Sequence, residues 1–216
     1  MPLIKKTEIG EGLLMLWQMT ETPDILGSML PRNNRNDQLK KITSPRRQKE
    51  WLTIRVMLNI ACSSGILTYS ETGQPELKSC SGGYKNISIT HSDKLAGIFL
   101  HKKYRVGMDI ENSARNFIRV QNKYLSEGEI TLAGSIPNGR GLFWCIKEAV
   151  YKAGGLPGIS FSNQIQITED KTGKIYAWLN AGNTQKRYEA HHFEIEDQII
   201  VYLTDEVQKE IHSPQT

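Results

Sequence analysis

The stretch that decides the fold is Arg105-Val106-Gly107-Met108-Asp109-Ile110-Glu111. Its two carboxylates stand two residues apart, after a run rich in isoleucine, phenylalanine, leucine and valine, which is typical of the end of a buried strand. Alternate side chains of a strand share one face. We therefore expect Asp109 and Glu111 to point the same way, with Ile110 in the core.

Two neighbouring acids on a half-buried surface repel each other unless a cation lies between them. Mg²⁺ suits such a pair, because it binds one or two carboxylates and completes its shell with water and substrate phosphate. The pattern thus indicates a magnesium site at Asp109 and Glu111. The alternative is a solvated edge strand whose acids bind nothing, and so short a motif does not separate the two.

The composition is that of an ordinary globular protein. Of the 216 residues, 38% are hydrophobic and 23% charged, which is enough apolar material for a packed core. No apolar run approaches the roughly 20 residues that cross a bilayer, and the N-terminus lacks a signal-peptide core, so we expect no membrane partner. Cys62, Cys80 and Cys145 lie far apart without a C-x-x-C motif. This spacing predicts a reduced, cytoplasmic protein with no disulfide or metal framework.

Charge is divided unevenly along the chain. Residues 1–105 hold 16 Lys and Arg against 9 Asp and Glu, a net +7, whereas residues 106–216 hold 11 against 14, a net −3. A basic half could hold phosphates and an acidic half a metal ion. A basic half is equally compatible with nucleic-acid binding or with simple solubility, so charge alone does not decide the function.

A long helix is predicted from residue 45 to about residue 62. Ser44-Pro45 combines a hydroxyl N-cap with a proline at the first helical position. Arg47, Trp51 and Arg55 follow at four-residue spacing, so both guanidinium groups can reach one neighbourhood. There they could bind phosphate oxygens, or they could simply form a solvated face.

A second long helix is predicted over about residues 141–153, ended by Gly154-Gly155. Trp144, Glu148 and Lys152 recur every four residues and share one of its faces. Glu148 and Lys152 could be an exposed ion pair and nothing more.

Shorter signals surround these helices. Ser126-Glu-Gly-Glu129 has the form of a capping box, so we interpret Glu129 as a cap. Strands are expected at 13–19, at 87–92, from 97 through 106 into Asp109, and as antiparallel hairpins between 164 and 204. His91, at the end of one strand, could be a structural hydrogen-bonding group or part of a site.

Each half therefore combines a long helix with a few antiparallel strands. This predicts an α+β fold: a pseudo-dimer of two similar lobes, each a long helix packed on a small antiparallel sheet. We place the lobes at residues 1–105 and 106–216, with the active site in the cleft between them.

Together these pieces resemble the 4′-phosphopantetheinyl transferase superfamily, in its two-lobed, surfactin-synthetase-activating (Sfp) type. The resemblance covers residues 44–157 and is carried by four motifs, namely Gly73-Gln74-Pro75, Ile87-Ser-Ile-Thr-His91-Ser92, Val106-Gly-Met-Asp109-Ile-Glu111 and Trp144-Cys-Ile-Lys147-Glu148-Ala-Val-Tyr151-Lys152. It implies Mg²⁺-dependent transfer of 4′-phosphopantetheine from coenzyme A to a serine of an apo acyl or peptidyl carrier protein, with Mn²⁺ as a possible substitute metal.

The resemblance also implies roles for individual residues. Three carboxylates match the family's metal ligands: Asp109, Glu111 and Glu148. Glu148 matches the base for the acceptor serine, Lys152 the lysine on the phosphates and leaving group, and His91 the histidine beside the coenzyme A phosphates. The expected coenzyme A contacts are Arg47, Arg55, Gly73, Gln74, Pro75, Thr90, His91 and Lys152.

Two positions depart from the family pattern. Thr90 stands where many relatives have serine, and Gln74 lacks the positive charge that some carry. The two-lobed length implies a monomer.

Two alternatives remain open. One is a catalytically silent relative that binds coenzyme A or a carrier. The other is a polyanion-binding module built on the basic segment 32–55, although no aromatic and basic reader motif supports a nucleic-acid partner.

Overall fold

The computed structural model describes residues 2–31 and 37–206 and has an α+β fold with antiparallel sheets. Its first part comprises β1 (Leu3–Ile9), β2 (Gly12–Gln18), α1 (Pro23–Ser28), α2 (Asp37–Lys40), α3 (Pro45–Ala61), β3 (Ile66–Tyr69), β4 (Pro75–Lys78), β5 (Asn86–His91) and β6 (Leu95–His101). Its second part comprises β7 (Val106–Asn112), η2 (Ile118–Lys123), α4 (Glu127–Ser135), α5 (Gly139–Gly154), α6 (Phe161–Gln164), β8 (Ile165–Glu169), β9 (Ile175–Ala181), β10 (Thr184–Ile195) and β11 (Gln198–Thr204).

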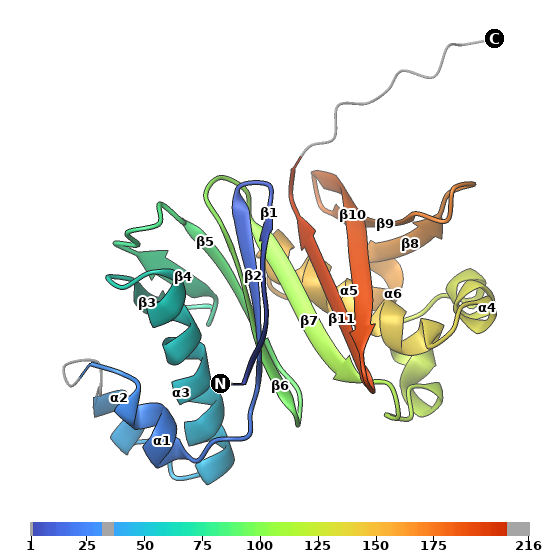
Figure 1. Ribbon diagram of the computed structural model, residues 1–216. Helices are drawn as coiled ribbons and strands as arrows, with labels where there is room; N and C mark the ends of the chain where they lie inside the picture. The colour runs from blue at the N-terminus through green and yellow to red at the C-terminus, as the bar shows by residue number, and fades with distance from the viewer. Residues whose placement is uncertain (1, 32–36, 207–216) are drawn as a thin grey trace.

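Two larger sheets and two long helices form the architecture. One sheet has the strand order β1-β2-β6-β5 and the other β7-β11-β10-β9-β8, while β3 and β4 form a separate hairpin. Figure 1 shows the earlier elements, in blue to green, on one side of the molecule and the later ones, in yellow-green to red, on the other. The predicted division after residue 105 falls in the link between β6 and β7.

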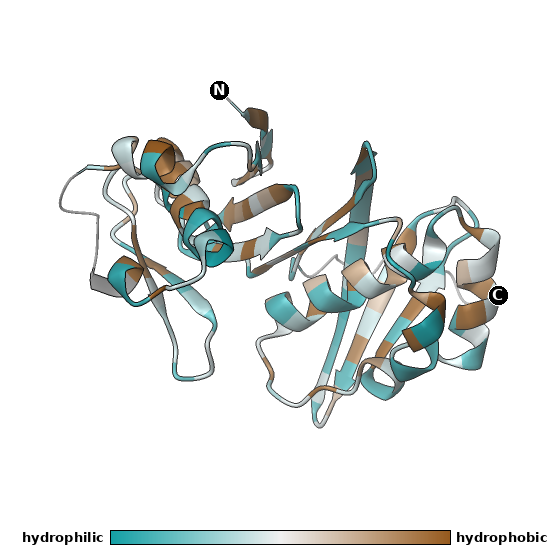
Figure 2. Ribbon diagram, turned by 90° about the horizontal axis from the view of Figure 1, so that it is seen from below, coloured by the Kyte–Doolittle hydropathy of each residue, from teal (hydrophilic) through white to brown (hydrophobic). Residues whose placement is uncertain are grey.

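The core lies in three layers, which explains why several strands are apolar throughout. On β2, Leu13, Met15 and Trp17 pack with α3, whereas Leu14 and Leu16 pack against the other sheet. Strands buried on both faces lose the alternation of polar and apolar residues. Figure 2 shows brown, hydrophobic positions in the strands of both sheets.

Several local predictions are confirmed. Ser44 caps α3, with its hydroxyl accepting the N–H of Arg47, and Pro45 occupies the first helical position. Ser126 and Glu129 form a complete capping box on α4. The predicted run from 97 into Asp109 is wrong in one respect, because β6 ends at His101 and β7 belongs to the other sheet.

The expectation of fully reduced cysteines is also wrong. Cys62, at the C-cap of α3, forms a disulfide with Cys80, which follows β4. The β3–β4 hairpin brings the chain back to the helix end, so the two Cα atoms lie 5.4 Å apart despite 18 residues of separation. Cys145 is a free, buried thiol. In the described part of the chain, no helix is long and apolar enough to cross a membrane.

Helix α5 lies directly on β7, and a single glycine permits this contact. A Cβ on Gly107 would overlap the carbonyl group of Ala149 in α5. Only the absence of a side chain lets the backbones approach so closely. The face of β7 that carries Asp109 and Glu111 is thereby held against the face of α5 that carries Lys152.

Replacing Gly107 by alanine should therefore destabilise the protein by about 4 kcal/mol or more, because neither backbone can give way without disturbing the core. Gly128 on α4 is the matched control, since a Cβ there meets nothing within 4 Å. Gly128→Ala should be neutral or slightly stabilising. Urea unfolding measures both changes, and equal midpoints for Gly107→Ala and wild type would contradict the close contact.

Candidate functional site

The free edge of β7 is closed by side chains rather than by another strand. β7 is the outer strand of its sheet and β5 the outer strand of the other sheet. The Ser88 hydroxyl accepts the N–H of Met108 at 3.0 Å, and the Thr90 hydroxyl accepts the N–H of Ile110 at 3.2 Å. Buried backbone N–H groups need acceptors. These two hydroxyl groups therefore join the sheets where Asp109 lies.

Asp109 is almost fully buried and is held on one oxygen only. Its Oδ1 accepts hydrogen bonds from Lys152 Nζ at 2.7 Å and from the Thr90 hydroxyl at 3.2 Å. Lys152 Nζ also donates to the carbonyl oxygen of Met108 at 2.9 Å. Asp109 Oδ2 is buried without an N–H or O–H partner, although the buried Cys145 thiol also interacts with this carboxylate.

Glu111 is on the same face as predicted, toward α5, but has other partners. Its Oε1 accepts from Arg115 at 2.6 Å and from the indole N–H of Trp144 at 2.9 Å. The guanidinium carbon of Arg115 also lies 5.2 Å from the centre of the Trp144 ring. Arg115 escaped the sequence analysis, although its position four residues after Glu111 could have indicated a pairing.

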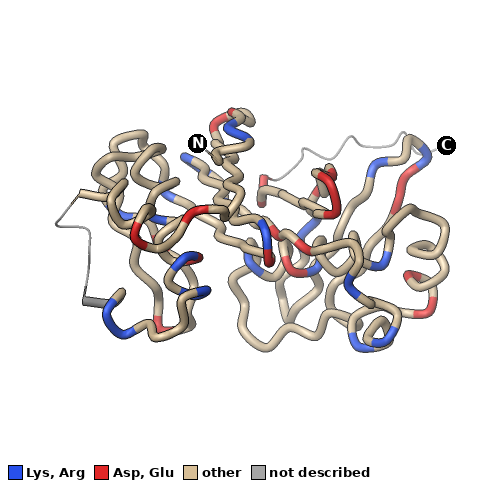
Figure 3. Tube along the Cα trace, turned by 60° about the horizontal axis from the view of Figure 1, so that its bottom comes forward, with Lys and Arg blue, Asp and Glu red and all other residues tan. Residues whose placement is uncertain are grey.

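Glu148 completes the acidic set from α5. Burial, followed by the negative charges of Asp109 and Glu111, raises the pKa of its carboxyl from 4.5 to about 6, while Lys152 and Arg115 oppose the rise. Asp109 and Glu111 thus each contribute to the raised pKa of Glu148. In Figure 3, acidic and basic positions lie together near the middle of the molecule, where its two parts meet.

The donor set fits a hard divalent cation. Carboxylate oxygens are the ligands that Mg²⁺ prefers, and Asp109 Oδ2 offers a buried one without an N–H or O–H partner. As the side chains of the described residues lie, however, no three His, Cys, Asp or Glu are grouped as a complete metal site. Lys152 and Arg115 instead balance Asp109 and Glu111. A cation bound here would have to share these carboxylates with the two basic side chains.

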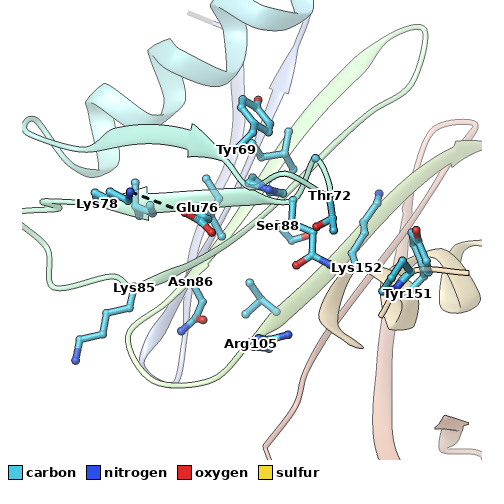
Figure 4. A pocket seen from close by; sticks show the side chains of 18 residues that line it. Tyr69, Thr72, Glu76, Lys78, Lys85, Asn86, Ser88, Arg105, Tyr151 and Lys152 are labelled. Carbon is cyan, nitrogen blue, oxygen red and sulfur yellow. Dashed lines mark ion pairs between the residues drawn. The ribbon is translucent and has the colours of Figure 1, made fainter. Parts of the chain in front are cut away.

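A pocket of about 630 Å³ opens beside Lys152. Figure 4 shows Lys152 and Tyr151 on one side of it, with Tyr69, Thr72 and Glu76 from the β3–β4 hairpin across from them. The charged side chains that line it are Lys78, Lys85, Arg105 and Lys152, against the single acid Glu76. The excess of positive charge suits an anionic ligand.

The Gly73–Pro75 turn lies in this pocket wall as well. Gly73 has φ +80°, a conformation that favours glycine. Gln74 lies against the C-terminus of α5, since a Cβ on Gly155 would be 3.2 Å from its amide atoms. The hairpin tip therefore reaches across to the helix that carries Lys152, a contact that no local sequence pattern predicts.

Four predicted cofactor residues lie outside the pocket lining, namely Arg47, Arg55, Thr90 and His91. Arg47 is exposed in the first turn of α3. Arg55 stacks on Trp51, with the guanidinium carbon 3.2 Å from the ring centre, and burial lowers the pKa of Arg55 to about 10 against the opposing effect of Tyr69. His91 Nε2 lies 3.5 Å from a carboxylate oxygen of Glu50. The predicted Arg32 and Arg35 of the basic segment fall outside the described residues.

Lys147 is a structural residue that the motif alone did not reveal. Its side chain is fully buried, pairs with Glu129 at 2.8 Å and also donates to the carbonyl oxygens of Phe161 and Ile165. Glu129 further accepts the N–H of Ile167 at 2.8 Å. Every donor of the ammonium group thus has a partner, which a buried charge requires. The pair fixes α5 relative to α4 and β8.

The burial of Glu148, together with repulsion from Asp109 and Glu111, predicts that Glu148→Gln stabilises the protein in the presence of a chelator. Because the Glu148 pKa is raised in the folded state, its ionised form costs stability above pH 6, by at most about 2 kcal/mol before solvent screening. Below the ordinary value of 4.5 the carboxyl is neutral in both states and the difference should vanish.

Melting temperatures at pH 8 and pH 4 measure this effect. The matched control is Glu127→Gln, at an exposed acid in the first turn of α4, which should not stabilise. Equal melting temperatures of wild type and Glu148→Gln at pH 8 would contradict the prediction that the ionised Glu148 carboxylate destabilises the folded protein.

Comparison with known proteins identifies the second part of the chain. Residues 105–203 match the family model described as ACPS, 4′-phosphopantetheinyl transferase superfamily. A search of curated proteins found no match. The matched segment contains Asp109, Glu111, Glu148 and Lys152, but not Thr90 or the pocket hairpin. Residues 105–203 therefore belong to the 4′-phosphopantetheinyl transferase superfamily.

Proposed function

We propose that the protein transfers 4′-phosphopantetheine from coenzyme A to a serine hydroxyl of an apo acyl or peptidyl carrier protein and releases 3′,5′-ADP. One observation carries the proposal. In the segment matched by the superfamily, Asp109 offers a buried free oxygen beside Lys152, and Lys152 also lines a cationic pocket. The proposed metal ligand, Asp109, and the proposed phosphate ligand, Lys152, are thus adjacent.

The pocket suits the nucleotide end of coenzyme A, which carries most of the negative charge. Lys78, Lys85 and Arg105 would attract its phosphates, and the Gly73–Pro75 turn would lie on the adenine side. Arg47, Arg55 and His91 would approach the 3′-phosphate from α3 and the end of β5. This would place the diphosphate at Lys152, which belongs both to the pocket and to the acidic site.

The chemistry then follows from the residues around Lys152. The serine oxygen forms a bond to the phosphorus that bears the pantetheine arm, and the bond from this phosphorus to 3′,5′-ADP breaks. Glu148 accepts the serine proton, a role for which a carboxyl of raised pKa is suited. Lys152 stabilises the negative charge of the departing phosphate.

Asp109, Glu111 and Glu148 would hold Mg²⁺, which neutralises charge on the diphosphate when bound. In this proposal the two parts of the chain, 1–105 and 106–216, are lobes of a pseudo-dimer with the site between them. We further propose that the protein acts as a monomer.

Intact-mass spectrometry of apo carrier proteins incubated with coenzyme A, Mg²⁺ and the protein tests this function. We expect a gain of one phosphopantetheine group that EDTA abolishes. Glu148→Ala should slow the transfer about 10²- to 10⁴-fold, the usual contribution of a general base, and Asp109→Ala should abolish it. Glu169→Ala, at an exposed acid on β8, is the control and should act like wild type.

No mass gain on any carrier would contradict the transferase function, and a coenzyme A titration would then separate the alternatives. Binding without transfer would indicate a silent relative. Absence of binding, together with salt-sensitive binding of an oligonucleotide, would indicate a polyanion-binding protein.

A further inference from the structure

The Thr90 hydroxyl lies inside the protein, between the two sheets. Thr90 is 5% exposed and belongs to β5, whereas both of its hydrogen-bond partners belong to β7. Thr90, like Ser88, thus joins the two sheets. Unlike Ser88, Thr90 also forms a hydrogen bond to the carboxylate of Asp109.

The hydrogen bonds of Thr90 leave little capacity for a ligand. A hydroxyl has one proton to donate, and Thr90 donates it to Asp109 Oδ1 while accepting the N–H of Ile110. Lys152 donates to the same Oδ1. Two donors therefore hold Oδ1, and the buried Oδ2 has no N–H or O–H partner.

We propose that Thr90 is a positioning residue for Asp109, and not a coenzyme A contact as the family resemblance implied. It fixes the rotation of the carboxylate, so that Oδ2 is the oxygen presented to the metal ion. This inference rests on the proposed function, because it gives a role to Thr90 within that metal site.

A threonine and a serine can both form these two hydrogen bonds. In threonine, branching at Cβ also restricts the first side-chain torsion. Lys152 alone would not provide the same restraint, because it reaches Asp109 on a long, flexible side chain. The hydroxyl of Thr90 and the ammonium group of Lys152 together hold Oδ1 and leave Oδ2 as the oxygen without such a hydrogen bond.

Ser88 offers a comparison on the same strand; its side chain also lines the pocket, so coenzyme A has to saturate each variant in the test. Its hydroxyl accepts the N–H of Met108, just as Thr90 accepts the N–H of Ile110. Ser88→Ala and Thr90→Val each remove one acceptor from the edge of β7, but only Thr90→Val removes the hydrogen bond to Asp109. Thr90→Ser retains that hydrogen bond and loses only a methyl group.

The test measures the affinity for Mn²⁺ by electron paramagnetic resonance. Coenzyme A is present at a concentration shown to saturate each variant. Loss of a group that orients a metal ligand typically weakens metal binding about 10- to 100-fold, and we expect this for Thr90→Val. Thr90→Ser and Ser88→Ala should bind Mn²⁺ as wild type does, although Ser88→Ala should melt at a lower temperature. Raising the Mg²⁺ concentration should restore the transfer rate of Thr90→Val.

Wild-type Mn²⁺ affinity in Thr90→Val would overturn the role of Thr90, as would an equal loss of affinity in Ser88→Ala. If Thr90→Val does not fold, Thr90→Ala carries the same test under the same criteria. Failure of the wild-type protein to bind Mn²⁺ with coenzyme A present would overturn the metal site itself, and so the proposed function.

Discussion

The hydrogen-bonded edge of β7 is the constraint on which the rest of the structure depends. An outer strand exposes N–H and C=O groups that must find partners. Here Ser88, Thr90 and Lys152 supply them, so that two antiparallel sheets meet without continuing one another. The same contacts hold Asp109 between the sheets and against α5. The contacts that join the two sheets therefore also position the candidate site.

The site shows how basic side chains balance a cluster of acids. Lys152 and Arg115 each pair with one carboxylate, at 2.7 and 2.6 Å. Glu148 responds differently, with a raised pKa. In the proposed function, a bound cation would relieve the repulsion that the two basic side chains relieve only in part.

Sequence reasoning succeeded where the signal was local. The capped helix ends and the shared direction of Asp109 and Glu111 follow from residues within a few positions of each other. It failed where segments far apart in the chain meet. The contact of Thr90 with Asp109 and the buried pair of Lys147 and Glu129 depend on how the sheets and helices pack, which no local pattern encodes.

In the proposed function, the edge of β7 beside the cationic pocket binds a metal ion and coenzyme A together. A crystal structure with Mn²⁺ and coenzyme A measures this directly through the anomalous scattering of the metal. We predict an anomalous peak within coordination distance of Asp109 Oδ2, the diphosphate against Lys152 and the nucleotide in the pocket lined by Lys85 and Arg105. A peak elsewhere, or coenzyme A bound away from Lys152, would contradict the claim.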